Sequence, residues 1–159
     1  MSAIRHARSD DARAIADLWN AMIVESLATF NSVAKSEAEV SALIVERPGA
    51  FFVAEAERVA GFATFWQFRA GAGYARTMEH TLVLGADARG RGLGRMLMQA
   101  VLDAARERGA HVMVAAITGD NPEGAAFHAA MGFERVGFLP EVGWKAGAWR
   151  DLVLMQRRL

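Results

Sequence analysis

The sequence has no cysteine among its 159 residues, and its 18 basic residues balance its 18 acidic residues. The first absence excludes a disulfide framework, a thiolate zinc site and a cysteine nucleophile. The lack of net charge removes the electrostatic case for nucleic acid or an anionic membrane as a partner. The four histidines, His6, His80, His111 and His128, show no metal-ligand spacing, so we expect no bound metal.

Long apolar runs are missing as well, since none approaches the roughly 18 residues that cross a bilayer. Arg5, Arg8, Asp10 and Asp11 occupy the place where a secretion signal needs an apolar core. We therefore expect a cytoplasmic protein. What the chain does have is 53% hydrophobic residues over a length typical of one domain, so residues 1–159 should form a single domain with a substantial core.

Apolar periodicity predicts an α/β protein with the element order βααβββαβαββ, in which a central mixed sheet is flanked by helices. Strands are expected at residues 4–7, 51–56, 59–66, 79–84, 111–118, 133–138 and 152–157. Helices are expected to begin near residue 9, at residue 36, at residue 93 and after residue 121. In the third helix the expected inward face comprises Leu93, Met96, Leu97, Ala100, Val101 and Ala104.

A glycine-rich segment, Arg-Gly-Arg-Gly-Leu-Gly-Arg at residues 89–95, lies between a predicted strand and this amphipathic helix. Such a turn presents free backbone N–H groups and the positive end of the helix dipole, which suits a phosphate or pyrophosphate. The alternative is an ordinary strand-to-helix turn with solvated arginines. The Walker phosphate loop does not fit, because Arg95 and Met96 stand where it needs Lys and Ser or Thr, and the dinucleotide fingerprint lacks its acidic residue.

Two motifs together resemble the GNAT family of acyl-CoA N-acyltransferases. Residues 89–94 resemble the family's acetyl-CoA pyrophosphate loop, and residues 121–133 resemble its downstream signature of an asparagine, a short helix with an aromatic or histidine, and Gly-Phe. Residues 74–79 and 139–157 resemble the phosphinothricin acetyltransferase branch. Residues 68–74, Phe-Arg-Ala-Gly-Ala-Gly-Tyr, give the nearest likeness, which is to the methionine sulfoximine and methionine sulfone acetyltransferases. The resemblance implies a GNAT fold with a central mixed β-sheet and acetyl-CoA as co-substrate.

The resemblance also implies which residues bind acetyl-CoA. These are Leu82, Val83, Leu84, Arg89, Gly90, Arg91, Gly92, Leu93, Gly94, Arg95 and Asn121. Backbone groups of the first three would pair with the pantetheine arm like an added strand, and the Val83 N–H would polarise the thioester oxygen. Asn121 would bond a pantetheine amide, although helix capping alone also explains an asparagine there. Gly124 stands where relatives usually have a serine, so a hydroxyl contact is lost.

Two residues are the implied catalytic groups. Acetyl transfer needs a neutral amine, and Glu79 is the candidate base because partial burial beside an apolar strand would raise its pKa. The alternative is an ordinary exposed strand carboxylate. His128 takes the position of a tyrosine that protonates the leaving thiolate in many relatives, or is a histidine packed against the sheet. His80 should point to the opposite strand face from Glu79, as a structural or surface residue.

The substrate site is assigned to residues near the middle of the chain. The candidates are Phe30, Arg69, Ala70, Gly71, Tyr74, Arg76 and Glu79. For the aromatic residues Phe30 and Tyr74, packing in the core is the alternative. Arg69 is the first choice for a substrate carboxylate or oxyanion, and Arg76 the second.

The resemblance implies acetylation of the α-amino group of methionine sulfone, methionine sulfoximine or phosphinothricin. The alternatives are another amine, such as a protein N-terminus or a polyamine, or a non-catalytic acetyl-CoA sensor. By analogy with the branch, we expect a homodimer, with Trp144, Lys145 and Trp149 shaping either the pocket or the dimer interface.

Overall fold

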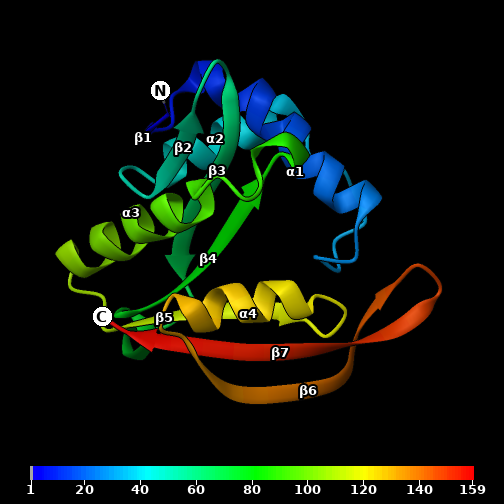
Figure 1. Cartoon of the computed structure of the whole chain (residues 1–159). Coiled ribbons are helices and arrows are strands. Elements are labelled where there is room, and N and C mark those ends of the chain that lie inside the picture. Colours follow the sequence, from blue (N-terminus) through cyan, green and yellow to red (C-terminus); the bar gives the residue numbers. More distant parts are fainter. Residues whose placement is uncertain (1) are drawn as a thin grey trace.

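The computed structural model describes residues 2–159, which form a seven-stranded sheet with helices on both faces (Figure 1). The strands are β1 (Ala3–His6), β2 (Phe51–Glu55), β3 (Val59–Gln67), β4 (Thr77–Leu84), β5 (Val112–Thr118), β6 (Glu134–Lys145) and β7 (Ala148–Arg158). The helices are α1 (Ala12–Glu25), α2 (Glu37–Glu46), α3 (Leu93–Glu107) and α4 (Pro122–Ala130), with short 3-10 turns η1 (Ser9–Asp11), η2 (Ala72–Tyr74) and η3 (Ala86–Ala88). The predicted order of strands and helices is confirmed.

The sheet contains one parallel pair, and that pair comes apart. The strand order is β1-β2-β3-β4-β5-β7-β6, and every neighbouring pair is antiparallel except β4 and β5. These two pair only where residues 77–79 face residues 112–114. Figure 1 shows β4 then rising away from β5. The later residues of both strands therefore have no strand partner on the facing side, and their backbone groups border a gap.

Two separate cores cover the two faces of the sheet, because side chains alternate along a strand. On β2, Phe51 and Val53 pack with α1, whereas Phe52 and Ala54 pack with α3. Aromatic packing dominates the α1 side, where the Trp19 and Phe62 rings lie 4.9 Å apart. The faces of the sheet are thus assigned: α1 covers one and α3 covers the other.

Helix α3 turns a different flank to the sheet from the one predicted. Its buried residues are Leu93, Gly94, Leu97, Met98, Val101, Leu102 and Ala105. Met96 is 44% exposed, so the expectation that it faces inward is wrong. Both flanks of the Leu97 stripe are apolar, and contact with β2 and β3 selects the one that carries Met98 and Leu102.

Helix starts follow local capping chemistry. The Ser36 hydroxyl accepts a hydrogen bond from the Glu39 backbone N–H at 3.1 Å, and the Glu39 carboxylate accepts one from the Ser36 N–H at 2.6 Å. This reciprocal capping box fixes the start of α2. At α4, the Asn121 side-chain oxygen accepts from the Gly124 N–H at 3.0 Å, with Pro122 in the first turn. Both predicted starts are confirmed.

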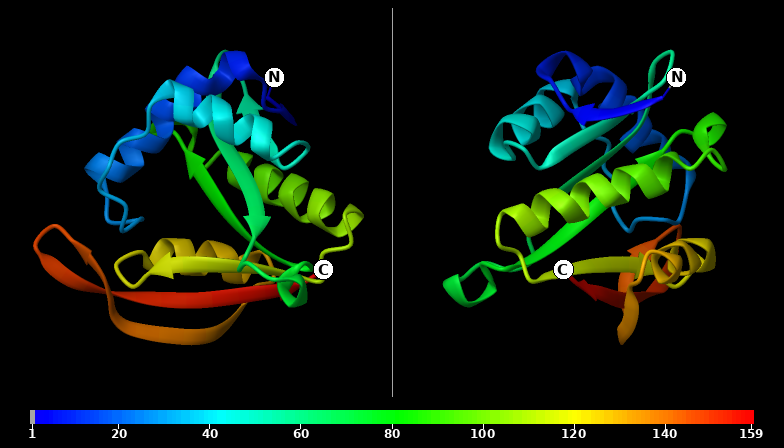
Figure 2. Two further views of the ribbon diagram at one scale, coloured as in Figure 1. Left: turned by 180° about the vertical axis from the view of Figure 1, so that it is seen from behind. Right: turned by 60° about the vertical axis from the view of Figure 1, so that its left-hand side comes forward.

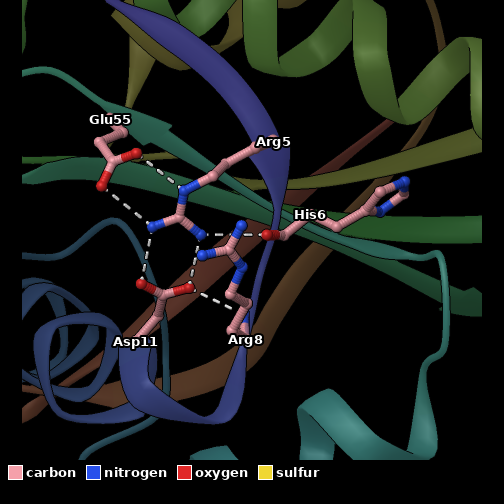
Figure 3. A network of polar contacts seen from close by, with 5 residues as sticks. All are labelled: Arg5, His6, Arg8, Asp11 and Glu55. Carbon is pink, nitrogen blue, oxygen red and sulfur yellow. Dashed lines mark hydrogen bonds and ion pairs between the residues drawn. The ribbon is translucent and has the colours of Figure 1, made fainter.

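A charged network fastens the first strand to the rest of the molecule (Figure 3). The Arg5 guanidinium donates to Asp11 at 2.8 and 2.9 Å and to Glu55 at 2.9 and 3.1 Å. Asp11 also accepts from the Arg8 backbone N–H at 2.8 Å. Because Glu55 belongs to β2 and Asp11 precedes α1, one guanidinium joins three elements.

The C-terminal hairpin is longer than predicted. Residues 139–151, expected as a loop between two short strands, instead extend β6 and β7, and β6 forms one edge of the sheet. Figure 2 shows this hairpin reaching past the end of β5 as a curved arm. Two register shifts bend it, one of them at Glu141, which adopts a left-handed φ of 54°. Across residues 2–159 there is no helix long and apolar enough to cross a membrane.

Candidate active site

A cleft of about 1110 Å³ opens where β4 and β5 separate. Its lining comes from α1 and the loop that follows, from β4 and its turn, from the second half of β5, and from α4 and the turn before it. Trp19 and Met22 border the cleft from the α1 face of the sheet, whereas Phe127 and His128 border it from the other face. The gap between the strands thus admits groups from both faces.

Glu79 lies at the point where the two strands part. It is the last β4 residue to pair with β5, opposite Val114, and its carboxylate borders the cleft. The side chain is half-buried, and burial raises the pKa of Glu79 above its ordinary value because the charged form loses hydration. It shares the α1 face with Val83, which belongs to the α1 core. A carboxylate so placed can take a proton from a cationic group entering on that face.

His80 points to the other face, as expected, but it is not a surface residue. Only 9% of it is exposed, and its Nε2 lies 3.1 Å from Nε2 of His128 on α4. Each ring also contacts a carbonyl oxygen through Nδ1: His80 that of Val114 at 3.2 Å, and His128 that of Gly124 at 2.6 Å. Burial lowers the pKa of both rings, that of His80 to about 3 with the neighbouring imidazole contributing.

The glycine-rich segment forms an open cradle at the start of α3. Gly90 and Gly92 have φ angles of 74° and 79°, a left-handed conformation that a glycine adopts without strain. No heavy atom lies within 4 Å of where a Cβ would stand on either glycine. Gly92 caps α3 without a side-chain hydrogen bond, so the first N–H groups of the helix are left for a ligand. Of the segment, Arg89 borders the cleft.

The β6 strand holds the loop between α1 and α2 over one end of the cleft. Buried Lys145 donates from Nζ to the carbonyl oxygens of Ile23 at 2.8 Å and of Thr29 at 2.7 Å. Gly143 lies under the Phe30 ring so closely that a Cβ there would stand 2.5 Å from Phe30 Cδ2. Phe30 lines the cleft, as predicted, and Lys145 acts on the loop rather than pointing its charge into the cleft. No sequence pattern predicts these hydrogen bonds of Lys145, because they join segments more than 100 residues apart.

The 69–76 segment lies elsewhere. Arg69, Ala70, Gly71, Tyr74 and Arg76 are exposed and are not among the residues that line the cleft. They connect β3 to the start of β4, whereas the cleft opens toward the end of β4. Among the predicted residues, the structure brings together Phe30, Glu79, Leu82, Val83, Leu84, Arg89, Asn121 and His128. Arg69 and Arg76 lie outside the cleft. Among the cleft residues that the sequence analysis did not assign are Trp19, Met22 and Lys35.

The sequence profile of the acetyltransferase (GNAT) family matches residues 6–133. The chain belongs to the GNAT family. Among named relatives, the L-amino acid N-acyltransferase MnaT of Escherichia coli (strain K12) is 35% identical over 98% of this chain and 93% of its own length. The L-methionine sulfoximine/L-methionine sulfone acetyltransferase of Pseudomonas aeruginosa is 43% identical over 65% of this chain and 60% of its own.

A solved structure shares the whole fold. An acetyltransferase from Salmonella typhimurium with its cofactor acetyl-CoA superposes with a TM-score of 0.96 at 33% identity, covering 100% of this chain and 94% of that one. The expected GNAT fold is therefore confirmed, and the chain is an acetyl-CoA-dependent N-acetyltransferase rather than a sensor without activity.

The residues of this chain fit acetyl-CoA. The open cradle at Gly90 and Gly92, with the N-terminus of α3 behind it, has the geometry that binds a pyrophosphate. The edge of β4 at residues 82–84 can pair with an extended amide-bearing arm. When bound, the thioester supplies the acetyl group. At Gly124, where the resemblance leads us to expect a serine, a Cβ would press against the Asn121 side chain in the conformation that caps α4.

Proposed function

We propose that this acetyltransferase acts on the α-amino group of a small amino-acid-like substrate, such as methionine sulfone, methionine sulfoximine or phosphinothricin. The observation that carries the proposal is the position of Glu79. Its half-buried carboxylate borders the cleft at the parting of β4 and β5, on the face covered by α1. The names of two relatives supply the substrate class: one is an L-amino acid N-acyltransferase and the other acts on methionine sulfoximine and sulfone.

In the proposed mechanism, the amine enters from the α1 face beside Phe30 and Trp66. Glu79 takes a proton from the α-ammonium, directly or through a water, so that a neutral nitrogen attacks the thioester. The backbone N–H of Leu82 or Leu84 polarises the thioester oxygen, because these groups face the gap between β4 and β5. The predicted donor, the Val83 N–H, is directed toward β3, since Val83 lies opposite Phe62 in a hydrogen-bonded antiparallel pair. His128, on the opposite face, gives a proton to the leaving thiolate. The raised pKa of Glu79 suits it to this exchange, because a base is most effective when its pKa lies near the working pH.

The substrate's acidic end has no assigned partner in the cleft of one chain. Arg69 and Arg76 remain predictions for that role, and because they lie outside the cleft they can fill it only if residues 69–76 move or if a second chain supplies them. Lys35 borders the cleft with its ammonium 4.6 Å from the Trp19 ring. We would therefore compare the variants Arg69→Ala, Arg76→Ala and Lys35→Ala. The residue that binds the substrate carboxylate is the one whose substitution raises KM for the amine.

We also propose that the protein is a homodimer, because β6 and β7 expose large apolar side chains. The exposed set is Val136, Phe138, Leu139, Val142, Trp144 and Trp149. Patches of this kind mark interaction sites. A cytoplasmic location stays a prediction.

The test of the reaction is release of the CoA thiol from acetyl-CoA with several amines side by side: methionine sulfone, methionine sulfoximine, phosphinothricin, spermidine and a short peptide. We expect saturable turnover with the first three. Turnover confined to spermidine or the peptide would overturn the proposed substrate class and would leave the assignment as an N-acetyltransferase in place.

A further inference from the structure

The contact between His80 and His128 cannot be satisfied by two neutral rings. A carbonyl oxygen only accepts hydrogen bonds, so each Nδ1 that contacts one must carry its proton. A neutral imidazole has a single N–H, so both Nε2 atoms would then be bare. Two bare nitrogens would face each other at 3.1 Å with their lone pairs opposed. Three contacts need three protons, and two neutral rings have only two.

A third proton removes the conflict. Placed between the two Nε2 atoms, it makes one ring the donor and the other the acceptor, and the pair then carries a single positive charge. The carbonyl dipoles of Val114 and Gly124 point their negative ends at the two rings and favour that charge, whereas burial opposes it. A fourth proton would put two N–H groups head to head, so the pair can hold one extra proton and no more.

The surroundings supply no other partner for this charge. On the two elements that carry the rings, the other titratable groups are Glu79 on β4 and Glu123 on α4. Arg157 on β7 lies at the end of α4. Glu79 projects to the opposite face of β4, Glu123 is exposed, and the Arg157 guanidinium donates to the Met131 carbonyl oxygen at 2.7 Å. Within residues 2–159 no carboxylate forms an ion pair with either ring. The Phe133 ring closes the remaining side, with its centroid 5.8 Å from that of His80 and 5.1 Å from that of His128.

We propose that His80 and His128 share one proton between their Nε2 atoms and act as a single acid toward the leaving thiolate. His128 borders the cleft and is the catalytic member, and His80 is the positioning residue behind it. In the step, the Nε2–H bond of His128 breaks, an S–H bond forms on the CoA sulfur, and the pair passes from one positive charge to none. Solvent returns the proton through the cleft. This inference rests on the proposed role of His128.

The first test counts protons without any substrate. The chain has four histidines, and the other two, His6 and His111, are exposed and remote from the cleft. The double variant His6→Gln, His111→Gln therefore leaves only the pair, whose ¹⁵N side-chain shifts can be followed against pH by NMR. As the pH falls below the ordinary histidine pKa of about 6.5, we expect both rings to titrate together into a state in which three of the four ring nitrogens carry protons, at a pH that burial shifts downward. Two independent titrations, or a pair that keeps two protonated nitrogens until the protein unfolds in acid, would overturn the shared proton.

The second test reads the pH profile of kcat. His80→Phe keeps a ring in the buried space but removes the nitrogen that shares the proton, so the alkaline limb should move to lower pH and kcat at neutral pH should fall by about tenfold. His80→Gln gives His128 a hydrogen-bonding amide in place of the imidazole, but an amide does not take up a proton in this pH range. The alkaline limb of the kcat profile should therefore stay displaced in this variant. If His80 only positions a neutral His128, Gln should restore the limb of the parent protein, and the proposal fails.

The two tests separate this inference from the proposed function. If no amine in the panel is acetylated while the NMR count gives three protons, the substrate assignment is wrong and the shared proton stands. If acetylation proceeds and the count gives two, the reaction stands and the pair is an ordinary hydrogen bond.

Discussion

At the scale of single residues, Glu79 makes the sharpest prediction. Glu79→Gln keeps the shape of the side chain and removes the base, so kcat should fall by about 10²-fold or more. The Kd of acetyl-CoA should not change, because the cradle lies at the start of α3 and the β4 edge at residues 82–84 binds through backbone groups that the substitution leaves in place. Steady-state kinetics and calorimetric titration measure the two quantities. Turnover equal to that of the parent protein would remove Glu79 from the mechanism.

The pH dependence of the parent enzyme follows from the same carboxylate. Burial raises the pKa of Glu79, and a general base acts only when it has lost its proton. The rate should therefore be fully developed above the raised pKa and should fall as the pH drops through it. The acid limb of kcat/KM should lie above the ordinary glutamate pKa of about 4.3. A rate that stays constant down to that pH would show that the group is not perturbed in the free enzyme.

Lys145 tests whether the α1–α2 loop shapes the substrate site. Lys145→Met removes two charge-assisted hydrogen bonds and leaves two carbonyl oxygens without their partner, which should lower the free energy of unfolding by about 2 kcal/mol. Because Phe30 lies in the same loop, KM for the amine should rise while the Kd of acetyl-CoA stays constant. Lys145→Gln, which keeps an amide donor, should recover part of both losses. An unchanged KM in Lys145→Met would assign the lysine to stability alone.

At the scale of elements, the start of α3 has an internal control at its other end. Gly92 and Gly109 adopt φ angles of 79° and 82°, and neither has an atom within 4 Å of a Cβ position. Valine at either site suffers the same backbone strain. Gly92→Val should in addition raise the Kd of acetyl-CoA about tenfold, equal to about 1.4 kcal/mol, because it stands in the phosphate cradle. An equal rise in Gly109→Val would show that strain, and not the cradle, causes the loss.

The ion pair that fastens β1 should make stability depend on pH. The hydrogen bond from Arg5 holds the pKa of Asp11 below its ordinary value, and Asp11 is buried. A depressed carboxyl pKa stabilises the fold above the unfolded-state value of about 3.9 and loses that effect as the pH falls through the folded-state value. At pH 7, Asp11→Asn should therefore lower the free energy of unfolding, measured by urea denaturation, by about 1–3 kcal/mol. In acid, the unfolding free energies of the variant and the parent protein should approach each other.

Asp87→Asn is the matched control for Asp11→Asn. Asp87 also pairs with an arginine, Arg58, at 2.6 Å, but both side chains are exposed and solvent screens their attraction. This variant should unfold at the urea concentration of the parent protein. A loss equal to that of Asp11→Asn would mean that charge alone, and not the buried network, stabilises the N-terminal strand.

Local signals explain which elements could be predicted. The capping box at Ser36, the Asn121 cap and the glycine turn at 90–92 each act within a few residues, so the sequence contains the whole interaction. The flank of α3 could not be assigned, because both sides of its apolar stripe are apolar and the sheet decides between them. The sequence predicts two short strands at the C-terminus because Pro140 and the glycines that follow are typical of turns, whereas the register shifts of β6 accommodate these residues within a longer strand.

At the scale of the whole molecule, the parts of the site that escaped sequence reasoning join distant segments. His80 and His128 are 48 residues apart and meet only because α4 packs across β5. Lys145 reaches carbonyl groups more than 100 residues away. Arg69 and Arg76 lie outside the cleft because their segment joins β3 to the start of β4, whereas the cleft opens toward the end of β4. Contacts of this kind depend on how the strands diverge, which no short motif encodes.

The final prediction concerns assembly, where the exposed face of the C-terminal hairpin is the evidence. Trp144 and Trp149 face each other across β6 and β7 with ring centroids 4.8 Å apart, and each is more than half exposed. If two copies associate through this face, light scattering should give twice the 17.2-kDa mass of the chain, and Trp149→Glu should give the single mass, because a charge in a closed apolar interface is costly. Val45→Glu places the same charge on an equally exposed apolar residue of α2 and should leave the dimer intact. A monomeric parent protein, or dissociation by both variants, would reject the hairpin as the interface.

If residues 69–76 of one copy complete the cleft of the other, the Trp149→Glu monomer should also lose affinity for the amine while its Kd for acetyl-CoA stays unchanged.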